Sequence, residues 1–135
     1  MKPERQSLVH KLQLFGLYLL ALFGLPAYAE LLVLQLQLKD HLFSPATLYV
    51  PEGEKVKLLI HNQDSTPEEF ESFSLNREKV ILGNSKGVVF IGPLEPGEHA
   101  FVGEYHPDSA RGTLIVLPKA QWQAQQQAKE GNGAD

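Results

Sequence analysis

Two short stretches of the sequence each carry side chains that could bind a metal ion. Glu69 and Glu71 lie two positions apart in one stretch, and Glu104 and His106 lie two positions apart in the other. Residues with this spacing point to the same side of an extended strand, so each pair can present both side chains in one direction. Carboxylates gathered at one place repel each other unless a cation is present. The two pairs therefore predict a metal site if the fold brings them together.

The donor types restrict which ion such a site would hold. Mixed carboxylate and imidazole sites suit ferrous iron and cupric copper, whereas oxygen-rich sites suit hard ions such as ferric iron. The chain of 135 residues has no Cys, and its only Met is Met1. A thiolate metal site, a Cys nucleophile and a disulfide are therefore excluded. With a further histidine in the first loop, the predicted metal ligands are His41, Glu69, Glu71, Glu104 and His106.

Each candidate ligand also has a simpler interpretation. His106 could hydrogen-bond within its own loop, Glu104 could form a charge pair with Arg111, and Glu69 could be a solvated loop acid. Glu68 is expected to face solvent, as most glutamates do. The other ionisable side chains near these stretches are expected to lie outside the site: Glu78 as an ion-pair partner of Arg77 and Lys79, and His61 and His99 as polar residues of their strands.

Alternating apolar and polar residues predict the strands that must position these side chains. Leu34, Leu36 and Leu38 alternate with polar neighbours, which is typical of a half-buried strand. About seven such short strands, with Pro and Gly turn signals roughly every ten residues, indicate an antiparallel sandwich. Residues 62–71 are expected to form a polar loop, and pairing is expected to resume near residues 73–75. In a sandwich, this loop and the loop before the last strand meet at one end, which would place Glu69 near Glu104 and His106.

The two ends of the chain differ from the central part in composition. Residues 1–29 combine a basic start, an apolar run over residues 12–25 and the sequence Ala27-Tyr28-Ala29, as in a cleavable secretory signal peptide. We therefore expect an exported, periplasmic protein with one domain over residues 30–117. Residues 118–135 form a polar tail that is expected to be flexible, with a helix over residues 120–129. The formal net charge of −4 argues against nucleic-acid binding through a basic surface.

Three stretches together resemble the small periplasmic cupredoxin-like domains. The first joins Phe43-Ser44-Pro45 to Leu48-Tyr49-Val50-Pro51-Glu52-Gly53, and the second runs from Val56 to Asp64. The third joins Pro96-Gly97-Glu98-His99-Ala100-Phe101 to Gly112-Thr113-Leu114-Ile115-Val116. The resemblance covers residues 31–117 and implies an all-β fold, a cupredoxin-like Greek-key antiparallel β-sandwich of about seven strands.

Two further motifs are similar to those of the EfeO-type cupredoxin-like proteins of bacterial iron uptake. They are residues 66–72 with residues 75–79, and Gly103-Glu104-Tyr105-His106. This resemblance implies binding of iron, copper or both, and a role in presenting or oxidising Fe(II) for an inner-membrane iron permease beside a second periplasmic metal-binding protein. Ferroxidase-type activity is one expectation, and metal binding and transfer is the stronger one.

The sequence departs from true blue-copper proteins at the positions that would hold the metal. Gly103 stands where such proteins carry the Cys ligand, and neither Ser109 nor Ala110 can act as a soft axial ligand. A type-1 electron-transfer site is therefore excluded, and the absence of sulfur donors after the predicted signal peptide also argues against a Cu(I) carrier. The alternative function is a metal-free Ig-like periplasmic interaction module for a membrane partner.

Overall fold

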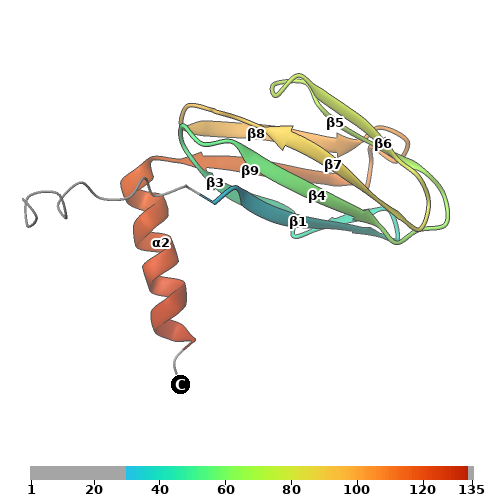
Figure 1. Ribbon diagram of the computed structural model, residues 1–135. Helices are drawn as coiled ribbons and strands as arrows, with labels where there is room; N and C mark the ends of the chain where they lie inside the picture. Colours follow the sequence, from blue (N-terminus) through green and yellow to red (C-terminus); the bar gives the residue numbers. More distant parts are fainter. Residues whose placement is uncertain (1–29, 134–135) are drawn as a thin grey trace, which may run out of the picture. The chain divides into compact units, whose positions relative to one another are not determined.

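The computed structural model describes residues 30–133, which form nine β-strands followed by one helix. Figure 1 shows the strands as two layers. The bounds are β1 Leu32–Lys39, β2 Leu42–Ser44, β3 Thr47–Pro51, β4 Val56–Asn62, β5 Glu68–Ser72, β6 Arg77–Ile81, β7 Ser85–Ile91, β8 Gly97–Gly103, β9 Arg111–Leu117 and α2 Lys119–Asn132.

The predicted β-sandwich is confirmed, with two sheets packed face to face. One sheet has the strand order β2-β1-β4-β7, and the other has the order β3-β9-β8-β5-β6. Two neighbouring pairs, β1–β4 and β3–β9, run parallel, and the remaining pairs are antiparallel. The sandwich thus has more strands than expected and is not purely antiparallel. The chain passes between the two sheets at several links, and β3 and β6 form the two edges of the second sheet.

Strict alternation of burial along the central strands builds the core between the sheets. In β4 every second residue from Val56 to Asn62 is buried, and Leu36 of β1 pairs in register with Ile60. Phe43, Phe70 and Phe101 pack together from both sheets with ring centroids 5.3–6.2 Å apart. Burying a side chain of this size contributes about 1.5–3 kcal/mol, so these rings hold the two sheets in a fixed relation.

The region after β4 differs from the sequence-based expectation. Residues 68–72 form β5 instead of the end of a polar loop, and residues 73–76 form a turn before β6 instead of resuming pairing. The cause is the alternation of burial in β5, where Glu68, Phe70 and Ser72 point inward. Acidic composition suggested a loop, whereas the spacing of the inward residues is that of a strand.

The helix predicted over residues 120–129 is confirmed and runs as α2 from Lys119 to Asn132, with none of its residues buried. It starts beside the β3–β4 turn, where the amide of Lys119 donates to the Glu52 carboxylate over 2.8 Å. The predicted signal peptide over residues 1–29 lies outside the described residues. Within residues 30–133, no helix has the length and apolar character needed to cross a membrane.

Candidate metal centre

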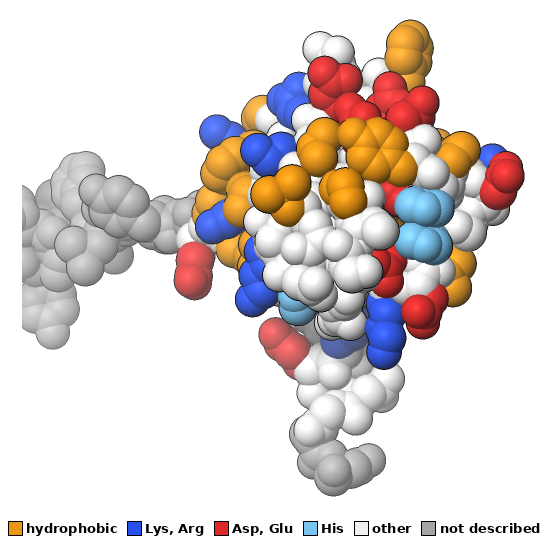
Figure 2. Space-filling view, turned by 90° about the vertical axis from the view of Figure 1, so that its right-hand side faces the viewer, with side chains coloured by type: hydrophobic (Ala, Val, Ile, Leu, Met, Phe, Trp, Pro, Cys, Tyr) orange, Lys and Arg blue, Asp and Glu red, His pale blue; other side chains and the backbone are white. Residues whose placement is uncertain are grey.

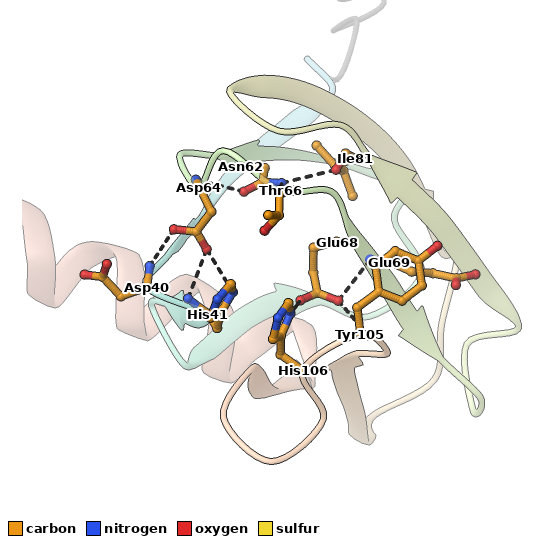
Figure 3. Close-up of polar contacts among 10 residues, drawn as sticks. All are labelled: Asp40, His41, Asn62, Asp64, Thr66, Glu68, Glu69, Ile81, Tyr105 and His106. Carbon is orange, nitrogen blue, oxygen red and sulfur yellow. Dashed lines mark hydrogen bonds and ion pairs between the residues drawn. The ribbon is translucent and has the colours of Figure 1, made fainter.

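Three side chains from separate parts of the chain meet at one end of the sandwich. Figure 3 shows His41 from the β1–β2 turn, Glu68 from β5 and His106 from the β8–β9 loop lying close together. Each offers one ligand atom, and these atoms all lie within 4.8 Å of one another. One carboxylate and two imidazoles at this separation can bind a single transition-metal ion after small side-chain adjustments.

Glu68 is the buried member of this cluster, and the expectation that it faces solvent is wrong. It is 1% exposed because it shares the inward face of β5 with Phe70. Its Oε1 accepts hydrogen bonds from the amides of Glu69 and Tyr105 over 3.0 and 2.8 Å, and its Oε2 lies 2.6 Å from His106 Nδ1. A buried carboxylate requires such partners, since an unpaired charge there would be strongly destabilising.

Gly103 provides the space that the Glu68 carboxylate occupies. A Cβ atom at this position would lie 2.6 Å from Glu68 Cδ and 2.7 Å from Ala110 Cβ, closer than real contacts allow. Any larger residue at position 103 would therefore displace Glu68. The absence of a side chain here, which excludes a thiolate ligand, is the same feature that admits the carboxylate.

The two histidines form a stacked pair that is open to solvent. Their ring centroids are 3.5 Å apart and their planes differ by 10°. The side chains of His41 and His106 are 40% and 33% exposed. Figure 2 shows two histidine side chains lying side by side at the surface of this face. An ion can therefore reach the nitrogen donors directly from solution, while the carboxylate lies beneath them.

Asp64 flanks the histidine pair on the side opposite to Glu68. Its Oδ2 lies 3.3 Å from His41 Nδ1, and its two oxygens accept the backbone amides of Asp40 and His41 over 2.7 and 3.0 Å. Burial alone would raise the pKa of Asp64, but these two amides and the nearby imidazoles hold that pKa below its ordinary value of 3.8. Asp64 is therefore an ionised neighbour of the site at neutral pH.

The other predicted ligands lie on the opposite face of the same sheet. Glu69 and Glu71 point outward from β5, and Glu104 follows the end of β8. The expectation that Glu104 and His106 share a strand face fails because β8 ends at Gly103 and the chain then turns. A hydrogen bond with Glu104, the charge of Glu104 and partial burial raise the pKa of Glu71, as do its other acidic neighbours. The structure thus brings His41 and His106 together and gathers the outward acids elsewhere.

The sequence did not predict the roles of three residues of the site region: Glu68 as the buried carboxylate, Gly103 as the residue that leaves space for it, and Asp64 as the neighbour of His41. The spacing of Glu68 and Phe70, two positions apart, was the available signal that Glu68 points inward. Arg111, expected as a partner of Glu104, donates its Nε to the Pro107 carbonyl instead. His99 contacts Ser74 Oγ through Nδ1 over 3.0 Å, and His61 lies on the outer face of β4, so neither belongs to the cluster.

Comparisons with known proteins agree with this fold. A family model described as a cupredoxin-like domain matches residues 13–116. The chain is 41% identical over 87 residues to the uncharacterized protein RP394 of Rickettsia prowazekii (strain Madrid E), a match that covers 64% of this chain and 70% of the relative.

Two solved structures illustrate the similarity in three dimensions. The metal-binding domain of the Cu(I)-exporting P-type ATPase CopA of Streptococcus pneumoniae D39, solved with Cu(I), matches with a TM-score of 0.57 and 17% identity, covering 63% of this chain and 84% of that domain. Auracyanin A, a "blue" copper protein of Chloroflexus aurantiacus, matches with a TM-score of 0.55 and 12% identity, covering 64% and 98%. At these identities the similarity shows the fold, and the donor atoms must be judged from this chain's own residues.

Proposed function

Because the chain belongs to the cupredoxin-like domain family, we propose that it binds a transition-metal ion through His41, Glu68 and His106, with cupric copper as the ion best suited to these donors. The observation that carries the proposal is the convergence of their ligand atoms within 4.8 Å of one another. Two of the three, His41 and His106, are ligands expected from the sequence. The proposed carboxylate ligand is Glu68, whereas the sequence predicted Glu69, Glu71 and Glu104.

The chemistry of the donor set favours some ions over others. Imidazole nitrogens and a carboxylate oxygen suit Cu(II), Zn(II) and Fe(II), and Cu(II) binds most tightly in the general order of divalent ions. Cu(I) prefers soft thiolate or thioether sulfur, which the described residues of this chain do not contain. We therefore propose binding of Cu(II) and not of Cu(I).

The exposure of the two imidazoles supports binding and transfer more than enzymatic turnover. Both rings are reachable from solvent, so a partner's ligands could replace them one at a time. Oxidation of Fe(II) remains a secondary part of the proposal, because one ion passes one electron and reduction of oxygen to water needs a partner or further ions.

The proposal extends to bacterial iron uptake on the strength of the sequence motifs alone. The stretches 66–72 and 103–106 resemble those of the EfeO-type proteins, and two of the three proposed ligands lie in them. In this extended form the protein is exported, acts in the periplasm and presents Fe(II) to an inner-membrane permease beside a second metal-binding protein. Gene neighbours that encode an iron permease would support this part.

The test is a titration of the purified protein with Cu(II), Zn(II) and, without oxygen, Fe(II). We expect one equivalent of Cu(II) to bind, and a concentration of 100 times the dissociation constant to raise the free energy of unfolding by about 2.7 kcal/mol. The control variant His61→Ala should bind Cu(II) as tightly as the native protein, because this histidine is also partly exposed but lies outside the cluster. Dissociation constants weaker than about 100 μM for all three ions, with unchanged thermal stability, would favour the metal-free interaction module instead.

A further inference from the structure

We propose that Asp64 is a positioning residue of this metal site, which holds His41 in place and selects the ring nitrogen that His41 presents. The inference rests on the proposed function, since it assigns a role toward the same ion. Asp64 is not one of the three converging donors. Its role follows from the unusual backbone of the turn that carries His41.

Asp40 and His41 form the two-residue turn that joins β1 to β2. Lys39 and Leu42 pair across it, and both turn residues have positive φ, 52° and 57°. A hairpin turn of this kind requires φ above zero at both central residues and favours Asn-Gly or Gly-Gly for that reason. The left-handed conformation is unfavourable for a residue with a Cβ. The chain thus places a histidine where glycine would fit with less strain, and such outliers gather at functional sites.

The Asp64 carboxylate stabilises this strained turn. Its two oxygens accept one amide each, Oδ1 from Asp40 over 2.7 Å and Oδ2 from His41 over 3.0 Å. The partners lie 24 and 23 positions away in the sequence, so the contact ties the β1–β2 turn to the end of β4. Bonds from backbone amides to an ionised carboxylate are stronger than neutral ones.

Asp64 is itself anchored to the core through Asn62. The side-chain carbonyl of Asn62 accepts the Asp64 amide over 3.0 Å, and the Asn62 amide group donates to the carbonyls of Thr66 and Ile81 over 2.8 and 3.2 Å. Asn62 is fully buried. Figure 3 shows this chain of contacts running from the core to the histidine pair. The position of His41 is therefore determined by the sandwich rather than by its own turn.

The same carboxylate also determines which nitrogen of His41 faces an ion. Oδ2 lies 3.3 Å from Nδ1, so this nitrogen faces the carboxylate and Nε2 is the ring nitrogen left for an ion. A carboxylate that orients a metal-binding histidine in this way fixes its tautomer and raises its basicity. Loss of such a partner typically lowers metal affinity 10–100-fold.

The first test compares Asp64→Asn with Asp40→Asn in Cu(II) titrations of the full chain. Both variants remove one negative charge from the same region, but the Asp40 side chain is exposed and takes no part in holding the turn. We expect Asp64→Asn to weaken Cu(II) binding about 10–100-fold and to alter the nitrogen couplings in the EPR spectrum, with little change for Asp40→Asn. Affinities of the two variants within about threefold of each other, with unchanged spectra, would overturn the inference.

The second test needs neither substitution nor metal. In the metal-free protein, long-range ¹H–¹⁵N correlation spectra report which nitrogen of each histidine carries the hydrogen. We expect the Nδ1–H form for His41, and a dominant Nε2–H form would contradict the role given to Asp64. If the unsubstituted protein fails to bind any ion, the proposed function fails, while this spectrum still decides whether Asp64 positions the ring.

Discussion

The inward acid Glu68 and the outward acids Glu69 and Glu71 occupy neighbouring positions of β5, and their surroundings are opposite. Glu68 points into the sandwich, where amides and an imidazole approach both of its oxygens. Glu71 points out of the same strand and faces Glu104, with Glu69 and Glu78 nearby. The inward acid has donors placed around it, whereas the outward acids mainly face one another. The proposed metal site therefore depends on the histidines placed beside Glu68, because the larger number of acids on the outer face has no such partners.

The pKa directions express the same contrast. Amide donors lower the pKa of Asp64, beside the histidine pair, although burial opposes this. The hydrogen bond and charge of Glu104 raise the pKa of Glu71. The surroundings of Asp64 stabilise its negative charge, whereas the acidic neighbours of Glu71 destabilise the negative charge of that residue.

The largest expected effect is the difference in Cu(II) affinity between variants of the inward acid Glu68 and of the outward acid Glu71. Glu68→Gln removes the anionic donor of the proposed site, and we expect it to weaken Cu(II) binding by more than about 100-fold. Glu71→Gln changes the same residue type on the same strand and serves as the control, with a change of less than about threefold. Calorimetric titration of both variants checks this. The reverse pattern would move the site to the outward acids.

The second effect tests the space beneath Glu68. Gly103→Ala would place a Cβ 2.6 Å from Glu68 Cδ and 2.7 Å from Ala110 Cβ. Overpacking of this kind costs about 1–3 kcal/mol, so we expect the free energy of unfolding to fall by that amount and Cu(II) binding to weaken as well. Denaturant unfolding measures the first quantity.

A matched substitution guards this result against a general effect of replacing glycine. Gly131 lies in α2 with open space around it. Gly131→Ala should leave the stability unchanged or raise it by up to about 1 kcal/mol, because alanine favours the helix. Equal behaviour of the two variants would show that Gly103 does not confine Glu68.

The sequence was sufficient to predict the sandwich and two of the three proposed ligands, but not the third. Alternation in β1 and β4 is unambiguous because polar and apolar residues take turns. In β5 the inward residues are Glu68, Phe70 and Ser72, so a polar side chain occupies a core-facing position and the pattern resembles a loop. Only the long-range contacts of Glu68 with Tyr105 and His106 reveal why a carboxylate is tolerated there.

The contacts of Asp64 were equally hidden, for a different physical reason. They join residues 23 and 24 positions apart and depend on backbone amides, which every residue carries. No pattern of side-chain types signals such a contact. The positive φ of His41 is likewise set by the turn length between β1 and β2, and becomes visible only once the register of these strands is known.

The third prediction is that one substitution at position 41 raises stability and weakens Cu(II) binding. His41→Gly relieves a positive φ of 57°, so we expect it to raise the free energy of unfolding by up to about 1 kcal/mol while weakening Cu(II) binding at least tenfold. Asp40→Gly relieves the neighbouring φ of 52° and should stabilise without loss of binding. A His41→Gly variant that is less stable than the native protein would mean that the stacked ring and the Asp64 contact outweigh the backbone strain.

The smallest expected effect is the pH dependence of stability at the outward acids. Because the pKa of Glu71 in the folded protein is above its ordinary value of 4.5, its contribution to stability is present below pH 4.5 and is lost as the pH rises through the folded pKa. Glu71→Gln should therefore melt at a slightly higher temperature than the native protein at pH 7 and at the same temperature near pH 4. Since Glu71 is reached by solvent, added salt should reduce the difference at pH 7.

Asp64 gives the opposite sign: its lowered pKa stabilises the fold above pH 3.8, and this contribution is lost as the pH falls through the folded value. Thermal unfolding at pH 4 and pH 7 checks both variants. Glu71→Gln should have a higher melting temperature than the native protein only at pH 7, whereas Asp64→Asn should have a lower melting temperature than the native protein at pH 7. Parallel pH profiles for the two variants would show that Asp64 and the outward acid Glu71 do not differ in the way their contacts indicate.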